Sequence, residues 1–163
     1  MRIYRVPFVA TTVTAAGTNN DLWTLTPADD KPIHLMGFRL GQISEVADAA
    51  EEGIDVTIVH LAATVTPGTG GAAVTPVPKD PGISDLAAGF TARINDTALA
   101  TSSGTTTVME ALAWNNRNTP FEVWYPDIDY APSARQASAL CIRMNTTIAD
   151  DMTFVGCAFI LEN

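Results

Sequence analysis

The stretch that decides the fold runs Phe90-Thr91-Ala92-Arg93-Ile94-Asn95-Asp96 and then, after a polar interval, Thr105-Thr106-Thr107-Val108-Met109-Glu110-Ala111-Leu112-Ala113-Trp114. Three shorter runs follow, from Phe121 to Tyr125, from Ala139 to Met144 and from Met152 to Leu161. Each run is rich in β-branched, aromatic or alternating apolar residues and is bounded by Gly, Pro, Asn, Asp or Ser. This pattern is typical of strands in a small antiparallel fold.

Four similar runs precede this stretch, namely Ile3 to Val13, Asp21 to Thr26, Pro32 to Ile43 and Asp55 to Leu61. Gly37 interrupts the third run and predicts a bulge or a close approach of another group to the backbone. About eight or nine strands at this spacing favour an all-β fold, an antiparallel β-sandwich. The 163 residues suit a single domain over 1–163, which is long enough to bury a core without disulfide support.

A segment rich in proline and glycine, from Pro67 to Gly82, joins the fourth and fifth predicted strands. Its glycines permit tight turns, whereas its prolines favour extended backbone. A long loop inside a compact domain is uncommon, and such loops are often functional or packed against a neighbour. We therefore expect a long loop over 67–82 whose apolar residues, Val74 and Val77 among them, contact another subunit. A solvated connection between two strands is the alternative.

The charge balance excludes some classes of partner. The chain has 9 basic and 18 acidic residues, a net charge of −9, and its arginines are scattered, whereas nucleic-acid binding relies on clustered Lys and Arg. No run approaches the ~20 apolar residues of a membrane span, and Arg5 and Pro7 interrupt any signal-peptide core. We expect a protein made in the cytoplasm with neither nucleic acid nor membrane as partner.

The last predicted strand provides the main argument for assembly. One of its faces carries Phe154, Ala158 and Ile160, and the other carries Val155, Cys157, Phe159 and Leu161. A strand that is apolar on both faces is covered on both faces, and in a sandwich the outer cover is either the 67–82 segment or another subunit. Charged residues make up only 17% of the chain, against about a quarter in an average protein, which favours a subunit. The candidate interface residues are Val74, Val77, Val155, Phe159 and Leu161.

The two cysteines, Cys141 and Cys157, lie in consecutive predicted strands at equal distances from Ala149. A hairpin that turns at Ala149 would place them opposite each other, close enough for a cross-strand disulfide. Two reduced, buried thiols are the interpretation that we favour, because that is the usual state of cysteine in a cytoplasm.

Few residues are arranged as a site for chemistry. His34 and His60 lie inside predicted strands, where histidine is more often structural than a metal ligand. Asp127 and Asp129 could bind calcium, but the sequence around them lacks the further ligands and the glycine of a calcium loop. A nucleophile elbow, a phosphate loop and a dinucleotide motif are all missing from the sequence. We expect a protein that is not an enzyme, with no catalytic residues, no cofactor and no metal.

Three tryptophans, Trp23, Trp114 and Trp124, occur within predicted strands. Large aromatic side chains more often fill a core than form an exposed platform for a sugar, so we expect a core role. Adjacent residues of a strand point to opposite faces. At least one of the pair Trp124 and Tyr125 therefore faces solvent or a partner.

Several of these runs resemble a group of small proteins encoded among the virion genes of tailed bacteriophages. The resemblance lies in Gly70–Pro78, Thr91–Thr97, Glu110–Arg117 and Ala149–Gly156, and it extends from Pro67 to Glu162. It implies a jelly-roll-like sandwich located on the capsid surface of the virion, with the role of a decoration or cement protein. Its implied partners are the major capsid protein and further copies of the chain, with a homotrimer favoured. A receptor-binding or carbohydrate-binding knob of a head or tail fibre is the alternative.

Overall fold

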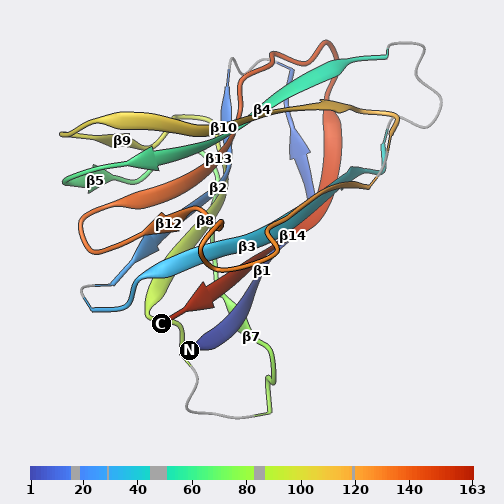
Figure 1. Cartoon of the computed structure of the whole chain (residues 1–163). Helices are drawn as coiled ribbons and strands as arrows, with labels where there is room; N and C mark the ends of the chain where they lie inside the picture. Colours follow the sequence, from blue (N-terminus) through green and yellow to red (C-terminus); the bar gives the residue numbers. More distant parts are fainter. Residues whose placement is uncertain (16–18, 29, 45–50, 83–86, 119) are drawn as a thin grey trace.

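The computed structural model describes residues 1–15, 19–28, 30–44, 51–82, 87–118 and 120–163. The regular elements of these residues are all β-strands, and they form two six-stranded antiparallel sheets packed on one another and a small two-stranded sheet (Figure 1). The predicted all-β antiparallel sandwich is therefore confirmed. The described part of the chain contains no helix of the length and apolarity needed to cross a membrane.

Sheet A has the strand order β11-β3-β14-β1-β7, and β12 also pairs with β3. Both chain termini lie in or next to this sheet, because β1 and β14 pair along almost their whole lengths. Its strands are β1 (Arg2–Val13), β3 (Ile33–Gln42), β7 (Val77–Pro78), β11 (Phe121–Trp124), β12 (Ser133–Ala134) and β14 (Met152–Glu162).

Sheet B has the strand order β10-β4-β13-β2-β8-β6, and the two-stranded sheet pairs β5 with β9. The strands of sheet B are β2 (Asn20–Pro27), β4 (Gly53–Leu61), β6 (Ala72–Val74), β8 (Phe90–Asp96), β10 (Thr106–Asn115) and β13 (Ala139–Met144). The small sheet consists of β5 (Val65–Thr66) and β9 (Thr101–Ser102).

The core lies between the two sheets and is built around aromatic rings. Trp23, at the centre of sheet B, is fully buried and donates its indole N–H to the carbonyl of Val6 at 3.1 Å. This bond satisfies the polar atom of a ring that otherwise contributes apolar area to the core. Ring contacts with centroid distances from 5.2 to 6.1 Å link Phe8, Trp23, Phe38, Phe121, Trp114 and Phe154 in that order.

The proline- and glycine-rich segment 67–82 is not a loop along its whole length. It contains β6, which pairs with β8 at one edge of sheet B, and β7, which pairs with β1 at one edge of sheet A. The segment thus passes from one sheet to the other and pairs with an edge strand of each (Figure 1). Its extended residues cover strand edges of its own domain, which removes backbone groups that would otherwise be free for pairing.

The expected hairpin at Ala149 is wrong. The strand that carries Cys141, β13, lies in sheet B, whereas the strand that carries Cys157, β14, lies in sheet A. The chain crosses from one sheet to the other between them, so the two residues do not pair. Both thiols are buried and free. Cys141 packs with Val59 and Leu61, outside the main core, on the outer side of sheet B.

At the opposite edge of the sandwich, β10 of sheet B and β11 of sheet A face each other through side chains. Trp114 stacks on Phe121 with ring centroids 5.7 Å apart and an angle of 8° between the ring planes. Further along, the hydroxyl of Tyr125 donates a hydrogen bond to the carboxylate of Glu110. These contacts hold the two strands together, but they leave this edge of the sandwich without backbone pairing between the sheets.

Candidate interaction surface

The outward side chains of β14 form the centre of a surface that we call the outer face of sheet A. Phe154, Ala158 and Ile160 are fully buried in the core. Their neighbours along the strand therefore point to the other side of the sheet, as the alternation of a strand requires. The outer face of sheet A comprises Arg5 and Pro7 of β1, Arg39 of β3, Glu122 and Trp124 of β11, and Val155, Cys157, Phe159 and Leu161 of β14.

An aromatic pair stands at the middle of this surface. The rings of Trp124 and Phe159 lie with centroids 4.7 Å apart, although one residue is on β11 and the other on β14. The strand between them, β3, carries Gly37 at the position that pairs with both. A Cβ atom on Gly37 would lie 2.6 Å from an atom of the Trp124 ring. The glycine is what allows the indole to cross β3, and Trp124 remains 51% exposed.

Next to the aromatic pair the surface is hollowed into an open groove of about 630 Å³. Its floor is low because Gly41 of β3, which pairs with the outward Val155 of β14, has no side chain. The apolar side chains of Val9 and Ile43 stand at its rim and are 70% and 54% exposed. An apolar groove with exposed apolar rims is the kind of surface that proteins use to bind other proteins.

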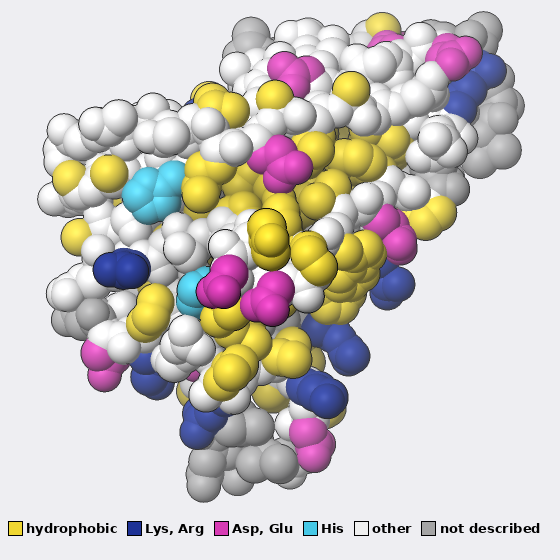
Figure 2. Space-filling view, viewed as in Figure 1, with side chains coloured by type: hydrophobic (Ala, Val, Ile, Leu, Met, Phe, Trp, Pro, Cys, Tyr) yellow, Lys and Arg dark blue, Asp and Glu magenta, His cyan; other side chains and the backbone are white. Residues whose placement is uncertain are grey.

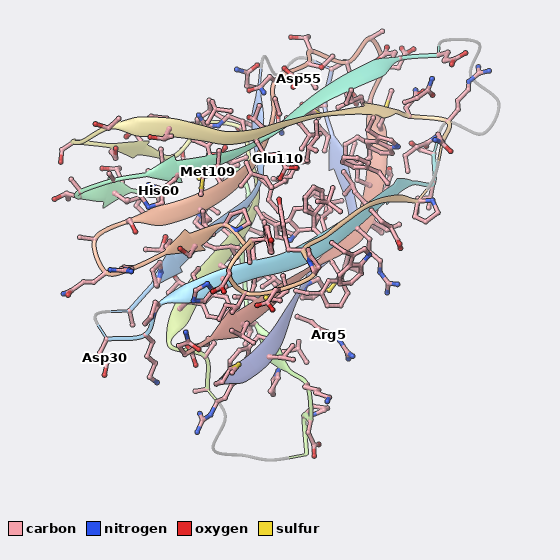
Figure 3. The ribbon with its side chains drawn as sticks, viewed as in Figure 1. Arg5, Asp30, Asp55, His60, Met109 and Glu110 are labelled. Carbon is pink, nitrogen blue, oxygen red and sulfur yellow. The ribbon has the colours of Figure 1, made fainter. Side chains whose placement is uncertain are left out.

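Positive charge accompanies the apolar groups. The guanidinium carbon of Arg39 lies 5.9 Å from the centre of the Phe159 ring, within cation–π distance. Arg5 stands opposite Phe159 on β1 and points away from the sheet (Figure 3). Burial raises the pKa of the Cys157 thiol, and the two arginines only partly offset this effect. In a chain of net charge −9, this surface suits a partner that presents carboxylates next to apolar side chains.

The structure separates the five candidate interface residues. Val155 and Phe159 lie on the outer face of sheet A and are partly exposed, and Leu161 is buried on the same side. Val77 lies on β7, at the edge of the same sheet. Val74 lies at the edge of sheet B, where it packs against the main core.

Sequence reasoning missed several residues of this surface and its groove, among them Arg39, Trp124, Val9 and Ile43. Trp23 and Trp114 are buried in the core as expected, but Trp124 is not. The signal for Trp124 was present, because either it or Tyr125 had to face outward, and Tyr125 packs against the core. The signal for Arg39 was a charged residue within an apolar strand.

Two acidic residues form a second polar cluster, on the outer side of sheet B. Asp21 and Asp96 are fully buried and stand opposite each other on β2 and β8. Arg143 donates to Asp21 at 2.7 Å, and Arg93 donates to Asp96 at 2.7 Å. The carboxylates also accept backbone N–H groups from Ala100 at 2.7 Å and from Gly71 at 3.1 Å, respectively. Because every charge is paired and the bonds fix the chain at Ala100 and Gly71, the cluster has a structural role.

The two histidines lie in different sheets, and Asp127 and Asp129 lie in a turn. His34 is on β3 in sheet A and His60 is on β4 in sheet B. Burial, with a contribution from Arg135, lowers the pKa of His34. The carboxylate of Asp127 accepts the N–H of Asp129 at 3.3 Å in a turn. Among the described residues, no group of three or more His, Cys, Asp or Glu side chains is placed to hold a metal ion.

Comparison with known proteins gives no relative. No protein family, no curated protein and no solved structure matches this chain.

Proposed function

We propose that this chain is a non-enzymatic structural protein of a bacteriophage particle, which decorates and cements the capsid by bridging major capsid proteins. The observation that carries the proposal is the outer face of sheet A, where the aromatic pair of Trp124 and Phe159 adjoins an open apolar groove. A central strand with an apolar outer side needs a cover. Segment 67–82 does not supply it, because its strands pair at the edges of the sheets.

The strand order supports the jelly-roll arrangement that the sequence resemblance implies. With the short strands and β8 set aside, eight strands remain, and we number them one to eight along the chain. Sheet A then has the order 6-3-8-1 and sheet B has the order 5-4-7-2. This distribution of eight strands over two sheets supports a jelly roll, a fold that is used in viral capsid proteins.

Attachment would act through burial of the apolar groups and pairing of the arginines. Trp124, Phe159 and Val155 supply apolar area, and its removal from water is the main driving force of association. Arg5 and Arg39 at the same surface would pair with carboxylates of the partner, and such pairs fix orientation more than they add affinity. A homotrimer on the capsid surface is the assembly that we favour, because decoration proteins of this kind occupy sites where capsid subunits meet.

Co-sedimentation with capsids tests this proposal. The capsids are assembled from the major capsid protein of the same genome without the decorating chain, and Phe159→Glu is compared with the wild type. We expect the variant to remain in the supernatant, because a carboxylate would be buried beside apolar groups. Thr91→Glu, at an exposed position of β8 in sheet B, is the matched control and should bind. Equal binding by wild type and Phe159→Glu would contradict the proposal.

A carbohydrate-binding knob remains the second candidate, because one specific feature favours it. The exposed ring of Trp124 has polar neighbours, since its indole N–H donates to Glu122 at 3.4 Å and Arg39 lies beside Phe159. Sugars stack on aromatic rings of this kind while polar groups bind their hydroxyls. Quenching or a shift of tryptophan fluorescence on addition of host surface glycans, absent in Trp124→Ala, would favour this function over decoration.

A further inference from the structure

The outer edge of β10 is a second surface without a partner, separate from the outer face of sheet A. This strand is ten residues long and, among the strands that the structure describes, pairs only with β4, so it forms one edge of sheet B. Edge strands are normally protected by charged residues, above all lysine, by proline, by a β-bulge, by short length or by a covering loop. Between Thr106 and Asn115 there is no lysine and no proline, and the only charged residue is Glu110. Val108 and Met109 on this edge are 58% and 47% exposed.

The ladder to β4 identifies the backbone groups that point away from the sheet. At the two ends of β10, Asn116 donates its N–H to Glu52 and Ala62 donates its N–H to Thr105, both at 3.1 Å. In an antiparallel ladder, alternate residues point their N–H and C=O groups to the partner strand. The pattern changes phase at Met109, where the β10–β4 register has a bulge. Asn115 also points outward, but its C=O already accepts the N–H of Asn118 at 2.9 Å. The other residues of β10 whose groups point outward are Thr106, Val108, Ala111 and Ala113.

This set of outward groups is complementary to itself. The spacings along the strand are two, three and two residues, which read the same in either direction. When a second copy runs antiparallel alongside, Thr106 pairs with the partner copy's residue 113, and Val108 with its residue 111. Each such pair exchanges two hydrogen bonds, so the contact would form roughly eight.

The side chains fit the same register. Val108 and Ala111 both point to the outer side of sheet B, because they pair with Val59 and Thr57 of β4. Leu112 pairs with Val56 and points to the core side, and it would meet Thr107 of the second copy, which points to that side as well. From Thr106 to Val108 and from Ala111 to Ala113, each residue would thus face a residue on the same side of the sheet, as continuous pairing requires.

The surroundings of this edge are also apolar. Leu112 of β10 and Phe121, Val123 and Tyr125 on the facing side of the sandwich edge are only partly buried. In the view of Figure 2, hydrophobic side chains gather between β10 and β3, with acidic side chains among them. Glu110 lies beside Met109 at the centre of the proposed contact (Figure 3), and its carboxylate already accepts the Tyr125 hydroxyl.

We propose that two copies of this chain join through their β10 strands, antiparallel about a two-fold axis between Met109 and Glu110, into one continuous sheet. The contact does not depend on a role in the virion, and it uses a different surface from the proposed capsid contact on the outer face of sheet A. In a decorated shell it would link neighbouring trimers to each other. Because each chain carries a net charge of −9, association through this edge should strengthen as salt screens the repulsion.

Site-specific disulfide formation tests the contact and its register. Val108→Cys and Ala111→Cys are made as separate variants of the full chain, one of them with an affinity tag. Each variant is oxidised alone, and the two are also oxidised as a mixture. The salt concentration is about 0.15 M or above, where the Debye length is about 8 Å or less and the repulsion between the chains is screened. Only the mixture should give cross-linked dimer, because residue 108 faces residue 111 of the other copy. Two copies of residue 108 would be roughly 10 Å apart, three residues along a strand, which is too far for a disulfide.

The mass in solution provides a second readout. Ala111→Pro removes an outward N–H and leaves the bonds to β4 in place, so the variant should fold, and proline is tolerated at such edge positions. Association through β10 should weaken about tenfold, the effect of one or two lost hydrogen bonds, whereas the control Ala111→Ser should associate normally. The β10 proposal would be overturned by cross-linking of either variant with itself or by absence of a cross-link in the mixture. Full binding to capsids by the proline variant would show that capsid binding does not require the β10 contact, so the two proposals can fail independently.

Discussion

The indole of Trp124 reaches across β3 to contact the ring of Phe159, with an angle of 40° between the ring planes. The two residues are 35 positions apart in sequence, and Gly37, which pairs with both on the strand between them, leaves room for the indole. Two large rings thus meet on the outside of a sheet, where Trp124 remains half exposed. A folded domain gains little from this arrangement, which is the reason to regard it as a contact surface.

Gly37→Ala tests the geometry of this pair. The added methyl group would lie 2.5 Å from the carbonyl oxygen of Val123 and against the Trp124 ring, so β11 must shift. We expect a loss of about 1–3 kcal/mol in the free energy of unfolding, the usual cost of overpacking, together with a red shift of tryptophan emission. Urea denaturation measures the first and fluorescence the second. An unchanged spectrum and unchanged stability would show that the ring does not lie on Gly37.

Arg143→Met should destabilise the domain strongly. It would leave the fully buried Asp21 without its ion-pair partner, and breaking a buried pair in this way costs about 3–5 kcal/mol. Arg93→Met should cost less, because the Arg93 side chain is 27% exposed and water can reach the charge it leaves behind. Chemical denaturation of the two variants gives the comparison. Equal, small effects would mean that water already solvates the Asp21 carboxylate.

The sequence predicts the long strands well and the path of the chain between them poorly. All nine predicted runs are strands, because their alternation reflects which side chains enter the core. The pairing of β13 with β14 was wrong because two strands joined by a short turn look the same whether they form a hairpin or cross from one sheet to the other. β6 and β7 were missed because a strand of two or three residues is too short to show an alternation of apolar and polar side chains. The position of β10 at the edge of sheet B depends on which distant segments pair with each other. The local sequence pattern of a strand does not contain this information.

The candidate surface was predicted in part. The outer side of β14 could be recognised because both faces of one strand are apolar, a property of the strand alone. Trp124 and Arg39 join that surface through register between β11, β3 and β14, which no spacing in the sequence reveals. Asp21 and Asp96 were missed because a single acidic residue at a strand end normally faces solvent. Only the register between β2 and β8 places them opposite each other.

Tyrosine titration tests the contact between β10 and β11. Burial and the hydrogen bond to Glu110 raise the pKa of Tyr125 well above its ordinary value of 10.0. A raised pKa means that the stabilisation by this group is complete below about pH 10 and is lost as the pH rises through the folded-state value. In a spectroscopic titration, Tyr125→Phe should remove one tyrosine that ionises well above pH 10, and Glu110→Gln should lower the pKa of Tyr125. A Tyr125 that ionises near pH 10 in the wild type would contradict the contact.

The two cysteines should be unreactive in the native protein. Burial, with the nearby Asp21 carboxylate, raises the pKa of Cys141 to about 12, and burial also raises that of Cys157. Because the thiolate is the reactive form, a thiol reagent at pH 8 should label neither until the protein is unfolded. Mass spectrometry after labelling provides the count. An intramolecular disulfide in the folded chain would contradict their placement in different sheets.

Hydroxyl-radical footprinting of Trp124, in the free protein and in the protein bound to capsids, tests whether the outer face of sheet A is the surface that contacts the capsid. The buried Trp23 and Trp114 provide an internal reference in both states. If the outer face of sheet A is the contact surface, oxidation of Trp124 should be high in the free protein and should fall toward the level of the two buried tryptophans on the capsid. Oxidation of Trp124 at the same rate in both states would contradict the claim.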